Sequence, residues 1–173
     1  MSNFFNLTVV IAIMPILFLY TFFFDSVSAQ INLQKCPDYS KTTDASIKSE
    51  TLGKCAKLVF EKEGREKAFK NFNDPKGGFV EGEVYIWTLD TNGICLQHAV
   101  NHKLEGMVTN RVKDSKGKPF IAEILNLSQK QDAGRVEYSW THPTSKKVAD
   151  KITFFIKAKD DKGDVILLNG HYK

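Results

Sequence analysis

The residue types with the clearest chemical potential lie near the C-terminus, where aromatic side chains accompany one lysine. Tyr138 and Trp140 lie two apart, so they share one face of a predicted strand. Lys151 opens the next strand-like run, Lys-Ile-Thr-Phe-Phe, and Tyr172 lies in the closing Gly-His-Tyr-Lys. A lysine ammonium on a partly apolar face needs a counter-charge, which a bound carboxylate would supply. This combination predicts a small pocket that binds an anion.

Each of these residues also has a purely structural interpretation. Lys151 would then extend its ammonium into water while its stem covers apolar surface. Tyr138 and Trp140 would be core aromatics that need no ligand. In the functional interpretation they form the pocket wall, with the phenol or the indole N–H donating to the ligand.

A second group of candidates lies earlier in the chain. His98 is near the end of the run Ile-Cys-Leu-Gln-His, on the face of Ile94 and Leu96. It would either donate to the anion or be a satisfied core or edge histidine. Tyr85 and Trp87 form another alternating aromatic pair, for which a core position is the stronger interpretation.

The sequence argues against an enzyme and against a metal or cofactor site. It contains no GxSxG or HExxH motif, and its four histidines have no spacing typical of metal ligands. A Cys95/His98 dyad would need both side chains on one face, whereas residues three apart on a regular strand point to opposite faces. The lysines are scattered singly, which does not support nucleic-acid binding.

The N-terminus predicts export from the cytoplasm. Residues 1–24 contain no Lys, Arg or His, and 7–24 form a nearly unbroken apolar run of 18 residues. Small side chains at Val27 and Ala29 resemble a signal-peptidase site, so we predict a signal peptide over 1–29 and a periplasmic or secreted protein. The alternative is an uncleaved anchor, residues 7–24, that holds the protein on the outer face of the inner membrane. Cleavage would remove one acid, Asp25, and leave a net charge of about +5 (24 − 19).

The three cysteines fit a structural role. An oxidising compartment permits a disulfide, and Cys36–Cys55 is the candidate pair. Cys95 lies in a strand-like run, where a free cysteine behaves as a small buried hydrophobe.

Helical signals come first along the chain. Residues 30–44 form an irregular lead-in that ends with the capping candidates Thr42, Thr43 and Asp44. A helix follows, interrupted at Gly64, and a short second helix extends over 65–72. The apolar residues at helical spacing in the first helix are Ile47, Leu52, Cys55, Leu58 and Val59.

Strand signals then dominate. Alternating and β-branched runs predict strands at 83–89, 94–100, 135–141, 148–159 and 164–172, with one helix over 120–130. Several strands are apolar on both faces, so both sides of the sheet should be covered. The fold class is therefore α+β: a long N-terminal helix on an antiparallel sheet of about five or six strands, with a second helix and loops on the other face.

A series of motifs spans residues 45–173: Gly64-Arg-Glu-Lys-Ala-Phe, Asn73-Asp-Pro-Lys-Gly-Gly-Phe, Val84-Tyr-Ile-Trp, Asp90-Thr-Asn-Gly, Gln97-His-Ala-Val-Asn, Leu104-Glu-Gly-Met, Lys113-Asp-Ser-Lys-Gly-Lys-Pro-Phe, Tyr138-Ser-Trp-Thr-His-Pro, Lys151-Ile-Thr and Gly170-His-Tyr-Lys. In this order they resemble the single Cache domain, a PAS-like extracytoplasmic sensing module of bacterial chemoreceptors and sensor kinases. The resemblance implies a pocket on the sheet face opposite the long helix, and a small carboxylate ligand such as acetate, propionate, pyruvate or lactate.

The resemblance also sets the expected partners. A receptor would continue beyond Lys173 into a second membrane helix, so we expect a stand-alone form that signals through a membrane receptor or sensor kinase. A homodimer through the N-terminal helix is a further expectation. The alternative function is a ligand-free interaction module, with its pocket filled by its own side chains, that docks on a membrane receptor.

Overall fold

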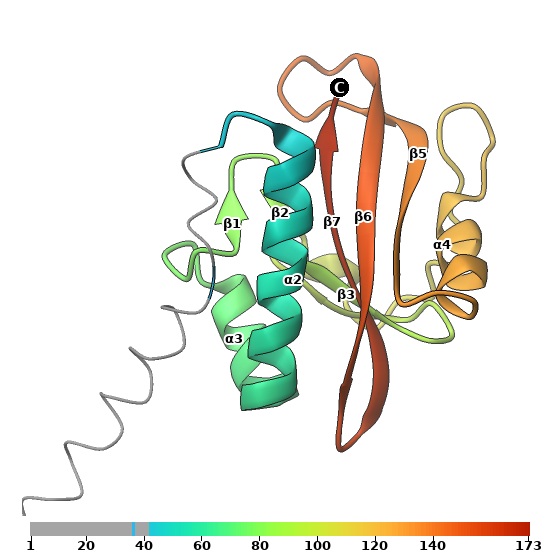
Figure 1. The fold of residues 1–173 in the computed structure, drawn as a ribbon. Helices are drawn as coiled ribbons and strands as arrows, with labels where there is room; N and C mark the ends of the chain where they lie inside the picture. The colour runs from blue at the N-terminus through green and yellow to red at the C-terminus, as the bar shows by residue number, and fades with distance from the viewer. Residues whose placement is uncertain (1–35, 37–41) are drawn as a thin grey trace, which may run out of the picture. The chain divides into compact units, whose positions relative to one another are not determined.

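Helix α2 (Ala45–Glu63) is the long helix that the sequence predicts (Figure 1). The structure is a computed structural model, and it describes residue 36 and residues 42–173. The Asp44 carboxylate accepts hydrogen bonds from the N–H groups of Ser46 and Ile47, at 2.8 and 3.0 Å. This satisfies donors that the first helical turn leaves unpaired. The helix ends at Gly64, whose φ of 78° favours glycine, and α3 (Arg65–Asn73) begins at the next residue.

The predicted leader lies outside the described residues. The same is true of most of the lead-in over 30–44, of which the structure describes residues 36 and 42–44. Within the described part of the chain, no helix is long and apolar enough to cross a membrane.

Five antiparallel strands form the main sheet, in the order β4-β3-β7-β6-β5. The last strand of the chain therefore lies at the centre, hydrogen-bonded to β3 on one side and to β6 on the other. This arrangement confirms the predicted α+β fold with a PAS-like antiparallel sheet. The strands are β3 (Trp87–Asp90), β4 (Cys95–His98), β5 (Ala133–Thr141), β6 (Val148–Asp160) and β7 (Gly163–Tyr172).

One predicted strand, 83–89, is wrong as a continuous element. It divides at Ile86 into β2 (Val84–Tyr85), which pairs with β1 (Val80–Glu81), and β3 in the main sheet. The reason is that the Ile86 N–H donates to the Phe79 carbonyl at 3.3 Å, while its own carbonyl accepts from Ala99. The chain therefore changes partners at this residue and moves from the small sheet to the large one.

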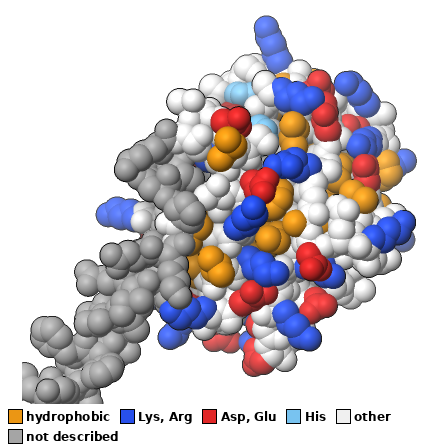
Figure 2. All heavy atoms as spheres, in the orientation of Figure 1, with side chains coloured by type: hydrophobic (Ala, Val, Ile, Leu, Met, Phe, Trp, Pro, Cys, Tyr) orange, Lys and Arg blue, Asp and Glu red, His pale blue; other side chains and the backbone are white. Residues whose placement is uncertain are grey.

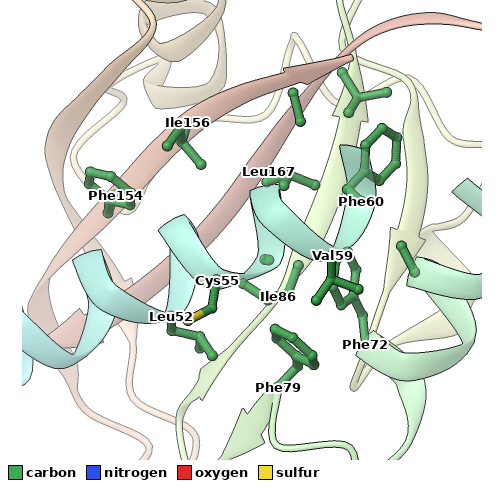
Figure 3. Packing of buried hydrophobic residues seen from close by; sticks show 14 of the residues in the cluster. Leu52, Cys55, Val59, Phe60, Phe72, Phe79, Ile86, Phe154, Ile156 and Leu167 are labelled. Carbon is green, nitrogen blue, oxygen red and sulfur yellow. The ribbon is translucent and has the colours of Figure 1, made fainter. Parts of the chain in front are cut away.

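The two faces of the main sheet carry separate cores, as the two-sided apolar strands predict. Helix α2 packs on one face, where Leu52, Phe60 and Leu167 are fully buried (Figure 3). Helix α4 (Phe120–Ser128) packs on the other face, with Phe155 and Ile124 in its core. Alternate residues of β6 and β7 serve the two cores, because successive side chains of a strand point to opposite faces.

Two residues assigned to the apolar face of α2 are not buried. Ile47 and Leu58 are 56% and 52% exposed. Leu52, Ala56 and Val59 form the face of the helix that packs on the sheet. Ile47 and Leu58 lie on a different face of the same helix. On the face shown in Figure 2, Lys and Arg side chains are interspersed with Asp and Glu, in agreement with a dispersed basic surface.

Candidate functional site

The α4 side of the sheet encloses a cavity of about 160 Å³. All six residues predicted to bind the ligand line it, although they come from β2, β3, β4, β5 and β6. Five further lining residues were not among the predicted site residues. The full lining is Tyr85, Trp87, His98, Leu104, Thr109, Val112, Phe120, Ile121, Tyr138, Trp140 and Lys151.

Lys151 supplies the positive charge of the cavity. The residue is 8% exposed, and its Nζ lies 4.7 Å from the Tyr172 ring centroid and 5.6 Å from that of Tyr85. Both rings present their electron-rich faces at distances typical of cation–π contacts. Among the residues that the structure describes, none forms a hydrogen bond or an ion pair with this ammonium. Burial lowers the pKa of Lys151, and the negative charge of Glu83 opposes that shift.

The sheet register explains why Lys151 has aromatic neighbours. Its Cα lies opposite that of Tyr138 on β5 and opposite that of Tyr172 on β7. Directly opposed residues of an antiparallel pair project on the same face, so the three side chains form one row across the sheet.

His98 provides a neutral hydrogen-bond donor. Its Nδ1 accepts the N–H of Asn101 at 3.1 Å, so Nε2 carries the ring proton and is the nitrogen available to a ligand. The ring is tilted against Tyr85 and Trp87, with centroid distances of 5.2 and 5.6 Å. Burial lowers the pKa of His98 to about 4, and the positive charge of Lys151 adds to the shift.

The remaining wall is aromatic. Phe120, the first residue of α4, stacks on Tyr138 with ring centroids 3.9 Å apart and an interplanar angle of 11°. Trp140 meets Phe120 edge-on at 5.5 Å and is 37% exposed. The Tyr138 hydroxyl is paired with Thr153 Oγ1 at 3.0 Å. Tyr138 is therefore placed to act as a wall, since its phenol is engaged within the protein.

Comparison with known proteins identifies this architecture. The family described as Single Cache domain 2 matches residues 41–172. The chain belongs to the single Cache domain family. Cache domains are extracytoplasmic sensor modules that bind ligands, and they are not enzymes.

Relatives of this Cache domain belong to chemotaxis proteins. A methyl-accepting chemotaxis protein of Pseudomonas putida, McpP, is 29% identical over 70 residues, which are 40% of this chain and 13% of that receptor. A methyl-accepting chemotaxis protein of Vibrio parahaemolyticus is 24% identical, with a TM-score of 0.51 over 85% of this chain and 84% of the other. A structure titled for carboxylic acid recognition by a Cache chemosensory domain is 20% identical, with a TM-score of 0.54 over 88% and 97%. The structural matches show a shared fold.

One wall of the Cache pocket comes from the connection between β4 and α4, which contains η3 (His102–Leu104). The Asp114 carboxylate holds this connection against β5, because it accepts the N–H groups of Ser139, Lys116 and Lys118 at 2.8, 2.9 and 2.7 Å. These hydrogen bonds hold the pKa of Asp114 below its usual range. The sequence signals in this region indicated turns and no pocket wall, so its lining residues were missed.

Cys95 and His98 lie on the same face of the sheet, contrary to the prediction from regular strand geometry. Strand β4 has an irregular register, since Thr88 pairs with Gln97 but Leu89 pairs with Cys95, and this bulge places Cys95 and His98 on the same face. The Cys95 thiol nevertheless donates to the Gln97 carbonyl at 3.6 Å. Burial raises its pKa to about 11, so it is a thiol at neutral pH. Within the described residues, no group of His, Cys, Asp and Glu is suited to hold a metal ion.

The buried, neutral His98 makes stability depend on pH. Its pKa is about 4 in the folded Cache domain and near 6.5 when unfolded, so unfolding takes up a proton between these values. The contribution of neutral His98 to the free energy of unfolding is complete above about pH 6.5. It is lost as the pH falls toward 4, at up to about 1.4 kcal/mol per pH unit. Urea denaturation at pH 7.5, 6 and 5 measures this slope. Burial lowers the pKa of His171 too, so His98→Gln should reduce the slope without removing it. Equal pH slopes in the wild type and in His98→Gln would contradict the lowered pKa of His98.

The Tyr138–Thr153 hydrogen bond can be tested separately. Thr153→Val leaves the buried phenol without its partner and should cost about 1–2 kcal/mol in the free energy of unfolding. Tyr138→Phe combined with Thr153→Val removes both polar groups, so the double variant should be more stable than the sum of the single changes implies. Denaturant titrations of the four proteins measure this coupling; additive losses would show that the pair does not interact.

Proposed function

We propose that this Cache domain is a sensor for a small monocarboxylate of the acetate, propionate, pyruvate or lactate type. The observation that carries the proposal is the Lys151 ammonium, which lies in an aromatic cavity without a hydrogen-bond or ion-pair partner among the described residues. A buried charge without a partner is costly, and an anionic ligand would supply the missing partner. His98 Nε2 adds a second, neutral donor to the same cavity.

The size and charge of the cavity restrict the ligand class. A volume of about 160 Å³ lies below the range of about 300–1,000 Å³ for drug-sized ligands, so a molecule of a few heavy atoms fits best. Lys151 is the one side chain in this lining that is charged at neutral pH. A second carboxylate on the ligand would be buried against apolar walls without a counter-charge, so a monocarboxylate is favoured over a dicarboxylate.

The affinity can be bounded. Four to six ligand heavy atoms at a ceiling of about −1.5 kcal/mol each amount to about −6 to −9 kcal/mol. This corresponds to dissociation constants from tens of micromolar to below one micromolar.

Titration calorimetry with propionate, and with propionamide as a neutral isostere, tests the proposal. Propionate should bind in the stated range, whereas propionamide and succinate should bind at least 10-fold more weakly. Equal binding of propionate and propionamide would refute recognition of charge. Failure of acetate, propionate, pyruvate and lactate alike to bind would favour the alternative, a ligand-free interaction module.

The proposed setting is the periplasm or the exterior, with the signal passed to a membrane receptor or sensor kinase. The family of extracytoplasmic sensors and the chemotaxis relatives support this setting. A homodimer through α2 stays a prediction; the exposed Ile47 and Leu58 are the apolar side chains that it would cover. Light scattering of the wild type and of Leu58→Glu checks it, because a dimer built on this surface should dissociate in the variant.

A further inference from the structure

Two cysteines that the pocket does not use lie together on the opposite side of the sheet. Cys55 is 1% exposed and belongs to the buried face of α2, among Leu52, Val59 and Ile86 (Figure 3). Cys36 is half-buried and packs against the same apolar cluster. The two thiols interact closely enough for Cys55 to lower the pKa of Cys36, while Cys36 raises the pKa of Cys55.

We propose that Cys36 and Cys55 form a disulfide when the protein reaches an oxidising extracytoplasmic compartment. The bond joins a residue that lies nine positions before the start of α2 to the middle of that helix. Both side chains pack in the same apolar cluster, so the bond would join two residues that are already neighbours in the fold. Extracytoplasmic compartments favour disulfides, and the family is extracytoplasmic.

The difference in exposure between the two thiols determines which one reacts first with an oxidant. The Cys55 thiol lowers the pKa of Cys36, which is also the more accessible sulfur, so Cys36 supplies the first thiolate. This thiolate attacks the disulfide of an oxidising thiol–disulfide oxidoreductase or of oxidised glutathione, and one oxidant thiolate leaves. Cys55 then loses its proton to a leaving thiolate and attacks Cys36 Sγ, which releases the second oxidant thiol. Two protein thiols are thereby oxidised, and one oxidant disulfide is reduced to two thiols.

Cys95 is an internal control. It is fully buried on the α4 side of the sheet, its thiol donates to the Gln97 carbonyl, and burial raises its pKa to about 11. A buried, protonated thiol reacts slowly with oxidants, so it should remain reduced when the other two pair.

Peptide mapping of the full chain tests the proposal. The protein is incubated with oxidised glutathione, quenched in acid, alkylated in denaturant and digested with trypsin. The expected products are a cross-linked pair, peptides 36–41 and 55–57, and an alkylated Cys95 in peptide 77–103. Alkylation of all three cysteines, a cross-link to Cys95, or glutathione adducts without the cross-link would each overturn the proposal.

Thermal unfolding provides a second measurement. The bond closes a loop of about 20 residues, and such loops raise the melting temperature of a domain of this size by about 10 °C. The oxidised wild type should melt about that much higher than protein refolded with reductant, whereas Cys36→Ala should melt equally in both conditions. Equal melting temperatures for the oxidised and reduced wild type would contradict the proposal. The thiols and the pocket lie on opposite faces of the sheet, so Cys36→Ala should bind propionate as the wild type does. Propionate titration of this variant therefore tests the pocket independently of the disulfide.

Discussion

Replacing Lys151 with methionine is expected to abolish carboxylate binding and to leave the ligand-free domain at least as stable as the wild type. Methionine has a similar length and no charge, so it fills the space of the lysine stem. It removes an ammonium that has no hydrogen-bond or ion-pair partner within the described residues, and the desolvation cost of that charge disappears. The ligand carboxylate would instead be buried beside an apolar side chain. Losing a buried charge pair typically costs about 2–5 kcal/mol, so affinity should fall by about 30-fold or more.

The matched control is Lys159→Met on the same strand. Lys159 is exposed and lies outside the cavity lining, about eight residues along β6 from Lys151. Calorimetry with propionate should show wild-type affinity for this variant, and both variants should melt close to the wild type. A Lys151→Met protein that binds propionate with wild-type affinity would remove the basis of the proposed function.

Replacing Gly170 with alanine is expected to misplace the Lys151 side chain. A Cβ at position 170 would lie 2.9 Å from the Ile152 carbonyl oxygen, 2.9 Å from Thr153 Oγ1 and 3.0 Å from Lys151 Cε. Real Cβ atoms rarely approach other heavy atoms this closely, so the lysine stem or the strand must move. Overpacking of this kind costs about 1–3 kcal/mol in the free energy of unfolding. Displacement of the ammonium should also weaken propionate binding by at least about 10-fold, since binding depends on its position.

A double-mutant cycle distinguishes misplacement of the lysine from general damage. Lys151→Ala removes Cε, one of the three crowded atoms, so Gly170→Ala should destabilise this background less than it destabilises the wild type. Denaturant titrations measure the stabilities, and calorimetry measures the affinity of the single variants. Wild-type affinity in Gly170→Ala would show that Gly170 does not position the ammonium.

Much of this fold was predictable, because its main signals are local. The N-cap at Asp44, the break at Gly64 and the alternation of Lys151, Thr153 and Phe155 against Phe154 each depend on residues close in the chain. The division of 83–89 at Ile86 was not predictable, since the uninterrupted run 84–88 consists of β-branched and aromatic residues, which favour a strand. The partner that interrupts the strand, Phe79, is identified only by the folded chain.

The candidate site was likewise predictable only in part. The aromatic and cationic residues could be identified from their types and spacing, whereas Thr109 and Val112 could not, because turn signals do not reveal which cavity a connection encloses. The bulge that turns Cys95 to the face of His98 depends on pairing with Thr88 and Leu89, and no motif in β4 indicates it. The donor nitrogen of His98 likewise follows from the N–H of Asn101.

The sequence by itself determined the α+β class and the faces of the long strands. Each follows from backbone periodicity, which places side chains on a face whatever lies across from them. Only the tertiary structure decided that the lysine has no hydrogen-bond or ion-pair partner among the described residues, that Tyr138 is engaged by Thr153, and that Cys36 packs against the apolar cluster that contains Cys55. These depend on contacts between segments far apart in the chain, whose distances are set by the packing of the whole domain and not by local conformation.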